Sequence, residues 1–211
     1  MFESVLSQTA KDTLAVLGKS NLVKGAYLAG GSALALHFGH RYSVDFDFFS
    51  QELFDPHTLS QSLGNIGTFK EDLAKGISLI GELNGVKLSC FNYNYPLISP
   101  TTIYFDVSIA HPHDIAAMKL VAITDRGTKR DFIDLYELIR QGINMDEMFA
   151  FYEKKYHSFE QNKFSLTKAL QYFTDADSGE MPQMIKSVSW DEVKRFFTDE
   201  SMRLAKKYLE G

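Results

Sequence analysis

Two aspartates, Asp45 and Asp47, stand two positions apart in a segment where acidic and large apolar residues alternate. This alternation is typical of a β-strand, and it places both carboxylates on one face while Val44, Phe46 and Phe48 face the core. At a separation of about 6–7 Å, the two charges repel by about 2–3 kcal/mol at an effective dielectric constant of about 20. A divalent cation removes that repulsion, and the hard oxygen ligands favour Mg²⁺, with Mn²⁺ as the alternative.

A glycine-rich turn precedes this strand. Gly30, Gly31 and Ser32 connect an expected apolar strand at 26–29 to an expected helix at 32–38. Glycine lets the backbone approach a phosphate closely, the N–H groups at a helix start attract an anion, and the Ser32 hydroxyl can bind a phosphate oxygen. Either motif alone has a plain structural interpretation, as a turn or as a solvated strand face. Together they predict a site for a nucleoside triphosphate and its metal, with in-line attack at the α-phosphorus.

Four charged residues on two expected helices form a second candidate cluster. Lys119 and Arg126 lie seven residues apart on one helix and can share a face directed at the triphosphate. Asp131 and Asp134 lie three apart on the next helix and also share a face. Ordinary ion pairing on the surface of a helix pair is the structural alternative for Lys119, Asp131 and Asp134.

Both regions resemble a known family. The first block runs from Gly30-Gly31-Ser32-Ala33-Leu34-Ala35-Leu36 to His40-Arg41-Tyr42-Ser43-Val44-Asp45-Phe46-Asp47-Phe48-Phe49, and the second includes Lys119-Leu120-Val121-Ala122, Arg126, Lys129, Arg130-Asp131 and Asp134-Leu135-Tyr136. They are similar to the motifs of the AbiEii/AbiGii toxin-type nucleotidyltransferases, a group within the DNA polymerase β-like nucleotidyltransferase superfamily. The resemblance covers about residues 27–140. It implies transfer of a nucleoside monophosphate from an NTP to RNA (a tRNA-like end) or to a protein hydroxyl, a toxin role, and a cognate antitoxin.

The resemblance also implies roles for individual residues. Lys119 contacts a phosphate, and Asp131 positions substrate or orients Arg126. The superfamily commonly uses a third carboxylate from a later strand, and Asp106 is the acid centred in the strand expected at 102–109, so we expect it to be a metal ligand or general base. A structural salt bridge is the alternative for Asp106. Arg41 is expected to neutralise phosphate or to brace the carboxylates.

The order of elements predicts an α+β fold. The expected strands lie at 26–29, 43–49, 68–73, 77–83, 86–93 and 102–109, with Asn84-Gly85 as a hairpin turn and Asp55-Pro56 as a helix start. Helices dominate from 113 onward. We therefore expect a nucleotidyltransferase-type mixed β-sheet flanked by helices at 1–110 and a helical C-terminal region packed on it at 111–211.

The composition narrows the function classes. A formal net charge of −5 gives no whole-protein attraction to nucleic acid. The single cysteine, Cys90, is expected to pack as a small apolar side chain. With no signal peptide and no apolar stretch long enough to cross a bilayer, we expect a cytoplasmic protein without a membrane partner. Two alternatives to the nucleotidyltransferase remain at this point: a glycosyltransferase whose Asp-x-Asp motif holds a sugar nucleotide, and a catalytically inactive nucleotide-binding or interaction module.

Overall fold

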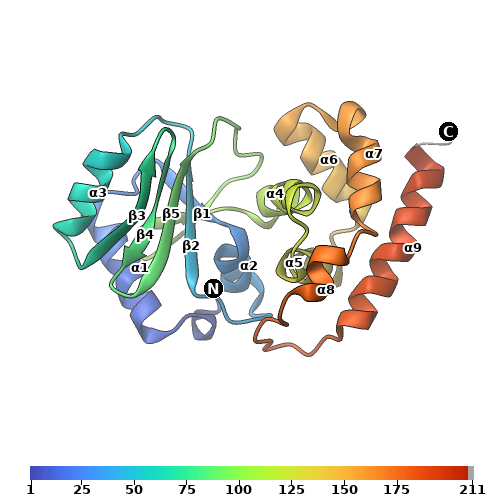
Figure 1. The fold of residues 1–211 in the computed structure, drawn as a ribbon, viewed down its shortest axis with the longest axis horizontal. Helices are drawn as coiled ribbons and strands as arrows, with labels where there is room; N and C mark the ends of the chain where they lie inside the picture. Colours follow the sequence, from blue (N-terminus) through green and yellow to red (C-terminus); the bar gives the residue numbers. More distant parts are fainter. Residues whose placement is uncertain (209–211) are drawn as a thin grey trace. The chain divides into compact units, whose positions relative to one another are not determined.

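A computed structural model describes residues 1–208, and the chain divides into two compact units at the His111–Pro112 bond (Figure 1). The first unit is built on a mixed β-sheet and the second consists of helices. Within the described residues, no helix is both long enough and apolar enough to span a membrane. The α+β fold expected from the sequence is confirmed.

One seven-stranded sheet organises the described part of the first unit, in the order β3-β4-β5-β2-β1-β7-β6. β2 pairs in parallel with β5, and β1 pairs in parallel with β7, while the remaining neighbours are antiparallel. The strands are β1 Ala26–Ala29, β2 Asp45–Ser50, β3 Phe69–Lys75, β4 Ser78–Leu83, β5 Val86–Asn92, β6 Thr102–Tyr104 and β7 Val107–Ile109.

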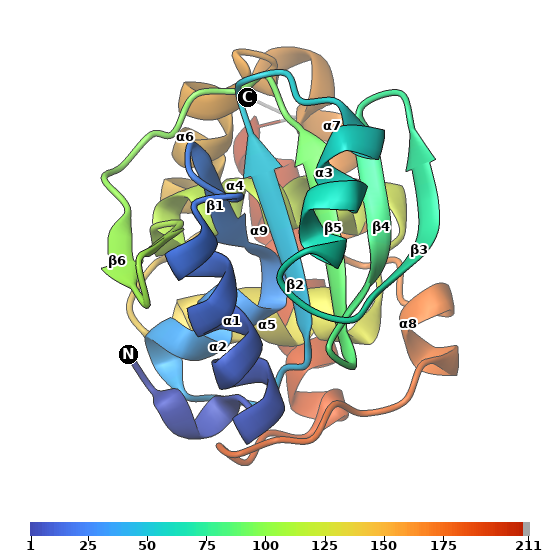
Figure 2. The ribbon, with the colours of Figure 1, turned by 90° about the vertical axis from the view of Figure 1, so that its left-hand side faces the viewer.

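Two helices of the first unit, α1 and α3, begin where the sequence supplies capping groups. α1 (Gln8–Ser20) is capped by Ser7, and α3 (Pro56–Gly64) begins with Asp55 accepting a hydrogen bond from the Thr58 backbone N–H. Both helices lie on the side of the sheet that faces the viewer in Figure 2. A short 3₁₀ helix, η1 (Glu3–Val5), precedes α1, and α2 (Gly30–Phe38) follows β1 directly.

The alternation predicted for β2 is observed. Phe46 and Phe48 are fully buried, whereas Asp45 and Asp47 are half-buried on the opposite face. Val44, which we expected to face the core, is 58% exposed because β2 begins one residue later, at Asp45. The β-strand periodicity therefore starts at the first aspartate and does not include Val44.

Two turns differ in how well they were predicted. Asn84 and Gly85 form the expected hairpin turn between β4 and β5, and both have positive φ angles. The prediction of a single strand at 102–109 is wrong. It is a hairpin, in which β6 and β7 are joined by Phe105 and Asp106 with φ angles of 49° and 59°.

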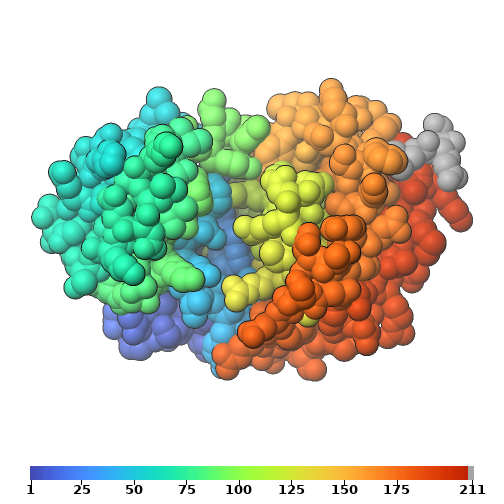
Figure 3. Space-filling model, in the orientation of Figure 1, coloured from blue at the N-terminus to red at the C-terminus, as the bar shows by residue number. Residues whose placement is uncertain are grey.

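The outer edge of the sheet is polar. β3 is an edge strand, which belongs to the turquoise part of the surface in Figure 3. Its residues Lys70, Glu71 and Asp72 are exposed. Charged side chains on an edge strand disfavour pairing with a strand of another chain. The edge thus carries a feature that keeps the sheet from extending by aggregation.

Helices of the second unit pack around α4 (Pro112–Asp125), which contacts α5, α6 and α7. A fully buried ion pair joins α4 to α6, with Lys155 Nζ 2.8 Å from Asp114 Oδ1. The aromatic core centres on Phe132, whose ring lies 5.1–5.9 Å from the rings of Phe173, Trp190 and Phe197. The other helices are α5 Lys129–Arg140, α6 Met145–Tyr156, α7 Phe159–Ala169, α8 Thr174–Ser178 and α9 Trp190–Tyr208.

Candidate active site

Asp47 lies directly beside the glycine turn. In the antiparallel register of β1 and β2, Asp47 pairs with Ala29, the last residue before α2. Gly30 has a φ of +65°, and a Cβ atom built on it would lie 3.0 Å from Asp47 Oδ2. Only glycine fits this conformation and this approach without strain. The fold therefore brings together the two motifs that the sequence placed far apart along the chain.

A hydrogen-bond network fixes the start of β2 to α2. The buried Ser32 hydroxyl donates to the backbone carbonyl of Asp45 and lies 2.8 Å from Ser43 Oγ. Arg41 Nη1 donates to the Tyr42 carbonyl at 3.1 Å and contacts Ser43 Oγ at 3.4 Å. These hydrogen bonds thus connect Arg41, through Ser43 and Ser32, to the backbone carbonyl of Asp45.

This network gives Ser32 a structural role. Ser32 is 2% exposed and its hydroxyl is directed at the Asp45 carbonyl, so it holds α2 and β2 in register. That the hydroxyl also binds a phosphate oxygen stays a prediction. Arg41, also buried, braces the backbone that carries the carboxylates.

Two residues of β5 accompany the aspartates on the same sheet face. Lys87 pairs with Asp45 and Ser89 pairs with Asp47 in the parallel register of β2 and β5. Residues paired across neighbouring strands project to the same face. Sequence reasoning missed both, because no local signal shows which later strand pairs with β2.

The first unit suits a metal shared with a substrate. Asp45 and Asp47 offer hard carboxylate oxygens on one half-exposed face, next to the first turn of α2, where backbone N–H groups have no intrahelical acceptors. Among the described residues, no group of three or more His, Cys, Asp or Glu side chains is arranged to hold a metal ion. Mg²⁺ at nucleotide sites is usually held by one or two carboxylates together with substrate phosphates, so the residues present fit this arrangement.

Asp106 does not belong to this group, and its assignment as third metal ligand or general base is corrected. Tyr27 and Leu28 of β1 pair with Ser108 and Ile109 of β7, so the β7 chain reaches the level of Ala29 and Asp47 only at Ala110. Asp106 lies four residues earlier, about 13 Å back along the strand direction. It occupies an exposed hairpin turn at the opposite end of the sheet.

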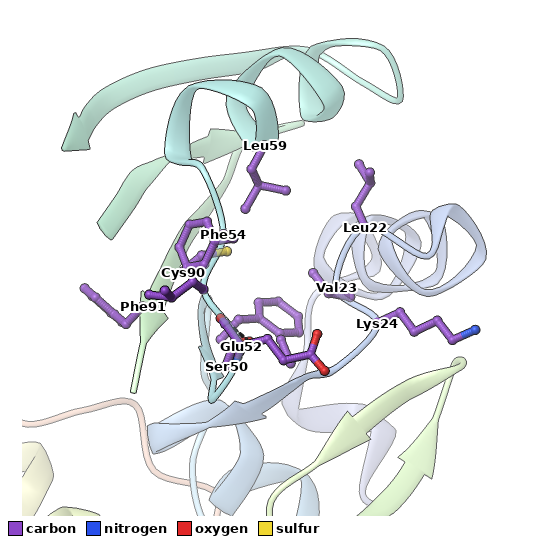
Figure 4. Close-up of a pocket in the computed structure, with 12 residues that line it drawn as sticks. Leu22, Val23, Lys24, Ser50, Glu52, Phe54, Leu59, Cys90 and Phe91 are labelled. Carbon is purple, nitrogen blue, oxygen red and sulfur yellow. Dashed lines mark hydrogen bonds between the residues drawn. The ribbon is translucent and has the colours of Figure 1, made fainter. Parts of the chain in front are cut away.

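A cavity of about 110 Å³ lies in the first unit (Figure 4), and neither Asp45 nor Asp47 is among the residues that line it. Phe48 and Cys90 line it from the sheet, and Leu59 lines it from α3. Because side chains alternate along β2, the face that carries Phe48 is opposite to the face that carries Asp45 and Asp47. Burial, with a smaller contribution from the charge of Asp47, raises the pKa of the Cys90 thiol to about 12.

In the second unit, four charged residues form a cluster. Lys119 Nζ lies 2.8 Å from Asp131 Oδ1 and 2.6 Å from Asp134 Oδ2. Asp131 also accepts hydrogen bonds from Arg126 Nε at 3.1 Å and from the Thr128 hydroxyl at 2.7 Å. The expected shared face of Asp131 and Asp134 is therefore observed, and Asp131 contacts Arg126 as the resemblance implied.

Lys119 and Arg126 were expected to share one helix face, but only Arg126 is largely exposed to solvent. α4 ends at Asp125, so Arg126 lies just beyond the helix and does not share it with Lys119. The side chain of Lys119 is 6% exposed, whereas that of Arg126 is 65% exposed. Thr128, which sequence reasoning missed, begins α5 with a Thr-x-x-Asp capping pattern that the sequence does contain.

Asp131 is held ionised by its neighbours. Burial acts to raise the pKa of Asp131, but the positive charges of Lys119 and Arg126 and their hydrogen bonds outweigh it and hold the pKa well below its usual range. An aspartate so fully engaged is a poor proton acceptor. Its geometry suits the positioning of Arg126.

Comparison with known proteins identifies relatives of the whole chain. A family model described as "Nucleotidyl transferase AbiEii toxin, Type IV TA system" matches residues 12–92 and 91–207. Uncharacterized protein aq_aa25 of Aquifex aeolicus (strain VF5) is 36% identical over 212 residues, which cover 98% of each chain.

Two solved structures share the fold. JHP933 from Helicobacter pylori superposes with a TM-score of 0.54 at 17% identity, over 97% of this chain and 95% of that chain. MenT4, a nucleotidyltransferase toxin from Mycobacterium tuberculosis H37Rv, gives a TM-score of 0.51 at 14% identity, over 94% of this chain and 89% of that chain.

Proposed function

Because the chain belongs to the AbiEii nucleotidyltransferase toxin family, we propose that it uses Asp45 and Asp47 to hold Mg²⁺ while transferring a nucleoside monophosphate to an acceptor hydroxyl. The acceptor oxygen attacks the α-phosphorus of the NTP, the hydroxyl loses its proton, and pyrophosphate leaves. Bound Mg²⁺ supplies charge neutralisation at the phosphates, and Mn²⁺ is the alternative ion. The acceptor is RNA or a protein hydroxyl.

The contact between Asp47 and the Gly30 turn supports this proposal most directly. Asp47 Oδ2 lies 3.0 Å from where a Cβ of Gly30 would be. The backbone N–H groups of this turn and the Asp47 carboxylate are therefore side by side. The N–H groups suit phosphate oxygens, and the carboxylate suits the ion that accompanies them. Ser32 and Arg41 act as positioning residues for this geometry.

We propose that the charged cluster of the second unit serves the same reaction. Arg126 offers an exposed guanidinium to a phosphate group, and Asp131 sets its orientation. Lys119 is covered by two carboxylates, so its contribution is to position Asp131 and Asp134 rather than to contact phosphate itself. Arg126→Ala is expected to raise the KM for NTP more than it lowers kcat, because it removes binding to a group present throughout the reaction.

Transfer of α-labelled NTP by the purified protein tests the assignment of the aspartates. With Mg²⁺ and total RNA or cell lysate as acceptor source, the wild-type chain should label a substrate, and chelation of the metal should stop the reaction. Asp45→Asn and Asp47→Asn should each abolish labelling while the circular dichroism spectrum stays unchanged.

Asp106→Asn is the matched control for these variants. It removes the same charge from an exposed turn, and asparagine tolerates the positive φ found there, so its activity should equal that of wild type. Labelling by both Asp45→Asn and Asp47→Asn at the wild-type rate would refute the metal assignment. Loss of labelling in Asp106→Asn would restore a catalytic role for that residue.

Family membership also bears on the alternatives and on partners. The chain is a nucleotidyltransferase, which sets aside the sugar-nucleotide interpretation of the Asp-x-Asp motif. We propose further that it is a toxin with a cognate antitoxin, because the family model describes a toxin of a toxin–antitoxin system. Induced expression in a bacterial host should stop growth, and Asp47→Asn should remove that effect.

A further inference from the structure

Aromatic side chains continue the sheet face that carries the aspartates. Along β2, Asp45, Asp47 and Phe49 alternate onto one face, so Phe49 lies about 6–7 Å beyond Asp47. In the sheet register, Phe49 has Tyr27 of β1 on one side and Phe91 of β5 on the other. The catalytic end of the face is acidic, and the next level along the strands is aromatic.

These rings form a connected series with Tyr93 and Tyr95, which we call the aromatic row. Ring centroids lie 6.0 Å apart for Tyr27 and Phe49, and 5.6 Å apart for Phe49 and Phe91. The series continues from Phe49 to Tyr93 at 5.2 Å and from Tyr93 to Tyr95 at 4.9 Å. Tyr27 is buried and anchors the row in the sheet, whereas Phe49, Phe91 and Tyr93 are half-buried and Tyr95 is 41% exposed.

Core packing accounts for the opposite face of these strands but not for the aromatic row. Phe46, Phe48, Leu88 and Cys90 project to that opposite face and are at most 5% exposed. Apart from the buried Tyr27, the rings of the row keep more of their surface accessible, although Phe49 and Phe91 lie on the same central strands. Partly exposed rings in series beside a nucleotide site are typical of surfaces that stack unpaired bases.

We infer that the aromatic row stacks bases at the single-stranded end of a nucleic-acid acceptor. This inference rests on the proposed function, and it selects a nucleic acid rather than a protein hydroxyl as the acceptor. The base of one NTP would occupy a single ring, whereas the row offers several rings in succession leading away from Asp47. A net charge of −5 gives little general attraction for a polyanion, so stacking is the physical source of affinity that this surface provides.

Equilibrium binding of a single-stranded oligoribonucleotide, measured by fluorescence anisotropy with the full chain and Mg²⁺, tests the row directly. Phe91→Leu and Tyr93→Leu keep apolar bulk and remove a ring, and each should weaken binding about ten-fold. Phe91→Trp and Tyr93→Phe keep a stacking face and should restore binding to within about two-fold. Phe69→Leu removes a half-buried ring from edge strand β3 and is the matched control, with binding unchanged.

Steady-state transfer assays then identify which base stacks. The row variants should raise the KM for the RNA acceptor and leave the KM for NTP unaltered. An increase confined to the KM for NTP would overturn the inference, because the row would then hold the base of the incoming nucleotide. Unchanged RNA binding in Phe91→Leu and Tyr93→Leu, or label found only on protein, would overturn it as well.

The binding measurement separates this inference from the proposed function. If Asp45→Asn and Asp47→Asn transfer label like wild type, the proposed metal site fails, whatever the row variants do. If those two variants are inactive while the row variants bind RNA normally, the metal site stands and the aromatic row is excluded as an acceptor site. Thermal unfolding of each variant verifies that its fold is intact.

Discussion

At the scale of single residues, Gly30 serves both the backbone conformation of the turn and the chemistry of the site. Its positive φ lets the chain leave β1 and enter α2 at once, and its missing side chain leaves room for the Asp47 carboxylate. Both demands fall on one residue, and only glycine meets them together. The turn is therefore part of the site as much as the acids are.

Replacing Gly30 separates these two demands. Gly30→Ala places a methyl group 3.0 Å from Asp47 Oδ2 and strains a φ of +65°, whereas Gly76→Ala strains a φ of +60° with no atom within 4 Å. Both variants should lose about 1–2 kcal/mol of unfolding free energy. Only Gly30→Ala should lose activity, by about 100-fold, because it displaces a carboxylate of the site. Denaturant titration and labelled-NTP transfer measure the two effects, and equal activity losses in both variants would contradict this account.

Asp131 carries a prediction about pH. Its pKa is depressed in the folded chain, so its ion pairs stabilise the fold above the unfolded-state pKa of about 3.9 and lose this effect as pH falls through that value and below it. At pH 7, Asp131→Asn should cost about 3 kcal/mol, because Lys119 stays buried with one fewer carboxylate partner. The difference in unfolding free energy between wild type and variant should shrink between pH 5 and pH 3. A difference that stays constant over that range would exclude the ionised pairs as its source.

The sequence predicted the position of a side chain where local interactions determine it, and failed where tertiary contacts do. Asp45 and Asp47 were placed on a common face because strand alternation is local. The hydrogen bond of the Ser32 hydroxyl was not predicted, because its acceptor, the Asp45 carbonyl, lies thirteen residues away and depends on tertiary packing. Asp106 was misplaced because a two-residue turn with positive φ angles interrupts an apolar run that reads as one strand.

At the scale of elements, the buried Lys155–Asp114 pair ties α6 to α4. Lys155→Met leaves the Asp114 carboxylate buried without this cation and should cost about 3–5 kcal/mol of unfolding free energy. Combining Lys155→Met with Asp114→Asn should recover much of the loss, since no uncompensated charge remains. Lys154→Met, one residue away and exposed, should change stability by less than about 0.5 kcal/mol. Chemical denaturation measures all three, and a single variant as stable as wild type would argue against a stabilising role for the pair.

Elements were predicted where local signals are strong. Asp55-Pro56 and Asn84-Gly85 marked a helix start and a hairpin because capping and turn chemistry act over a few residues. The parallel pairing of β2 with β5 could not be read from the sequence, since it joins segments about forty residues apart. For that reason Lys87, Ser89 and the aromatic row escaped the sequence analysis.

At the scale of the whole molecule, the charge is modestly negative and evenly distributed. The formal net charge is −5 over the full chain, with no strongly basic half. Affinity for single-stranded RNA changes with salt in proportion to the phosphates neutralised, with a slope of about −0.7 per phosphate. We therefore expect the slope of log affinity against log salt to be shallower than about −2. A titration from low to high salt measures it, and a slope near −5 would instead reveal an extensive basic contact surface.

The shielded thiol of Cys90 has a practical consequence for spectroscopy. Cys90 has little solvent access, and its pKa is raised to about 12, so the thiol is almost entirely protonated near neutral pH. It should therefore not react with maleimide reagents in the native protein. Since no other cysteine occurs in the sequence, dyes or spin labels can be attached to two engineered cysteines at exposed positions without first deleting the natural one. The distance between the two probes would report motions of the chain without signal from a labelled Cys90.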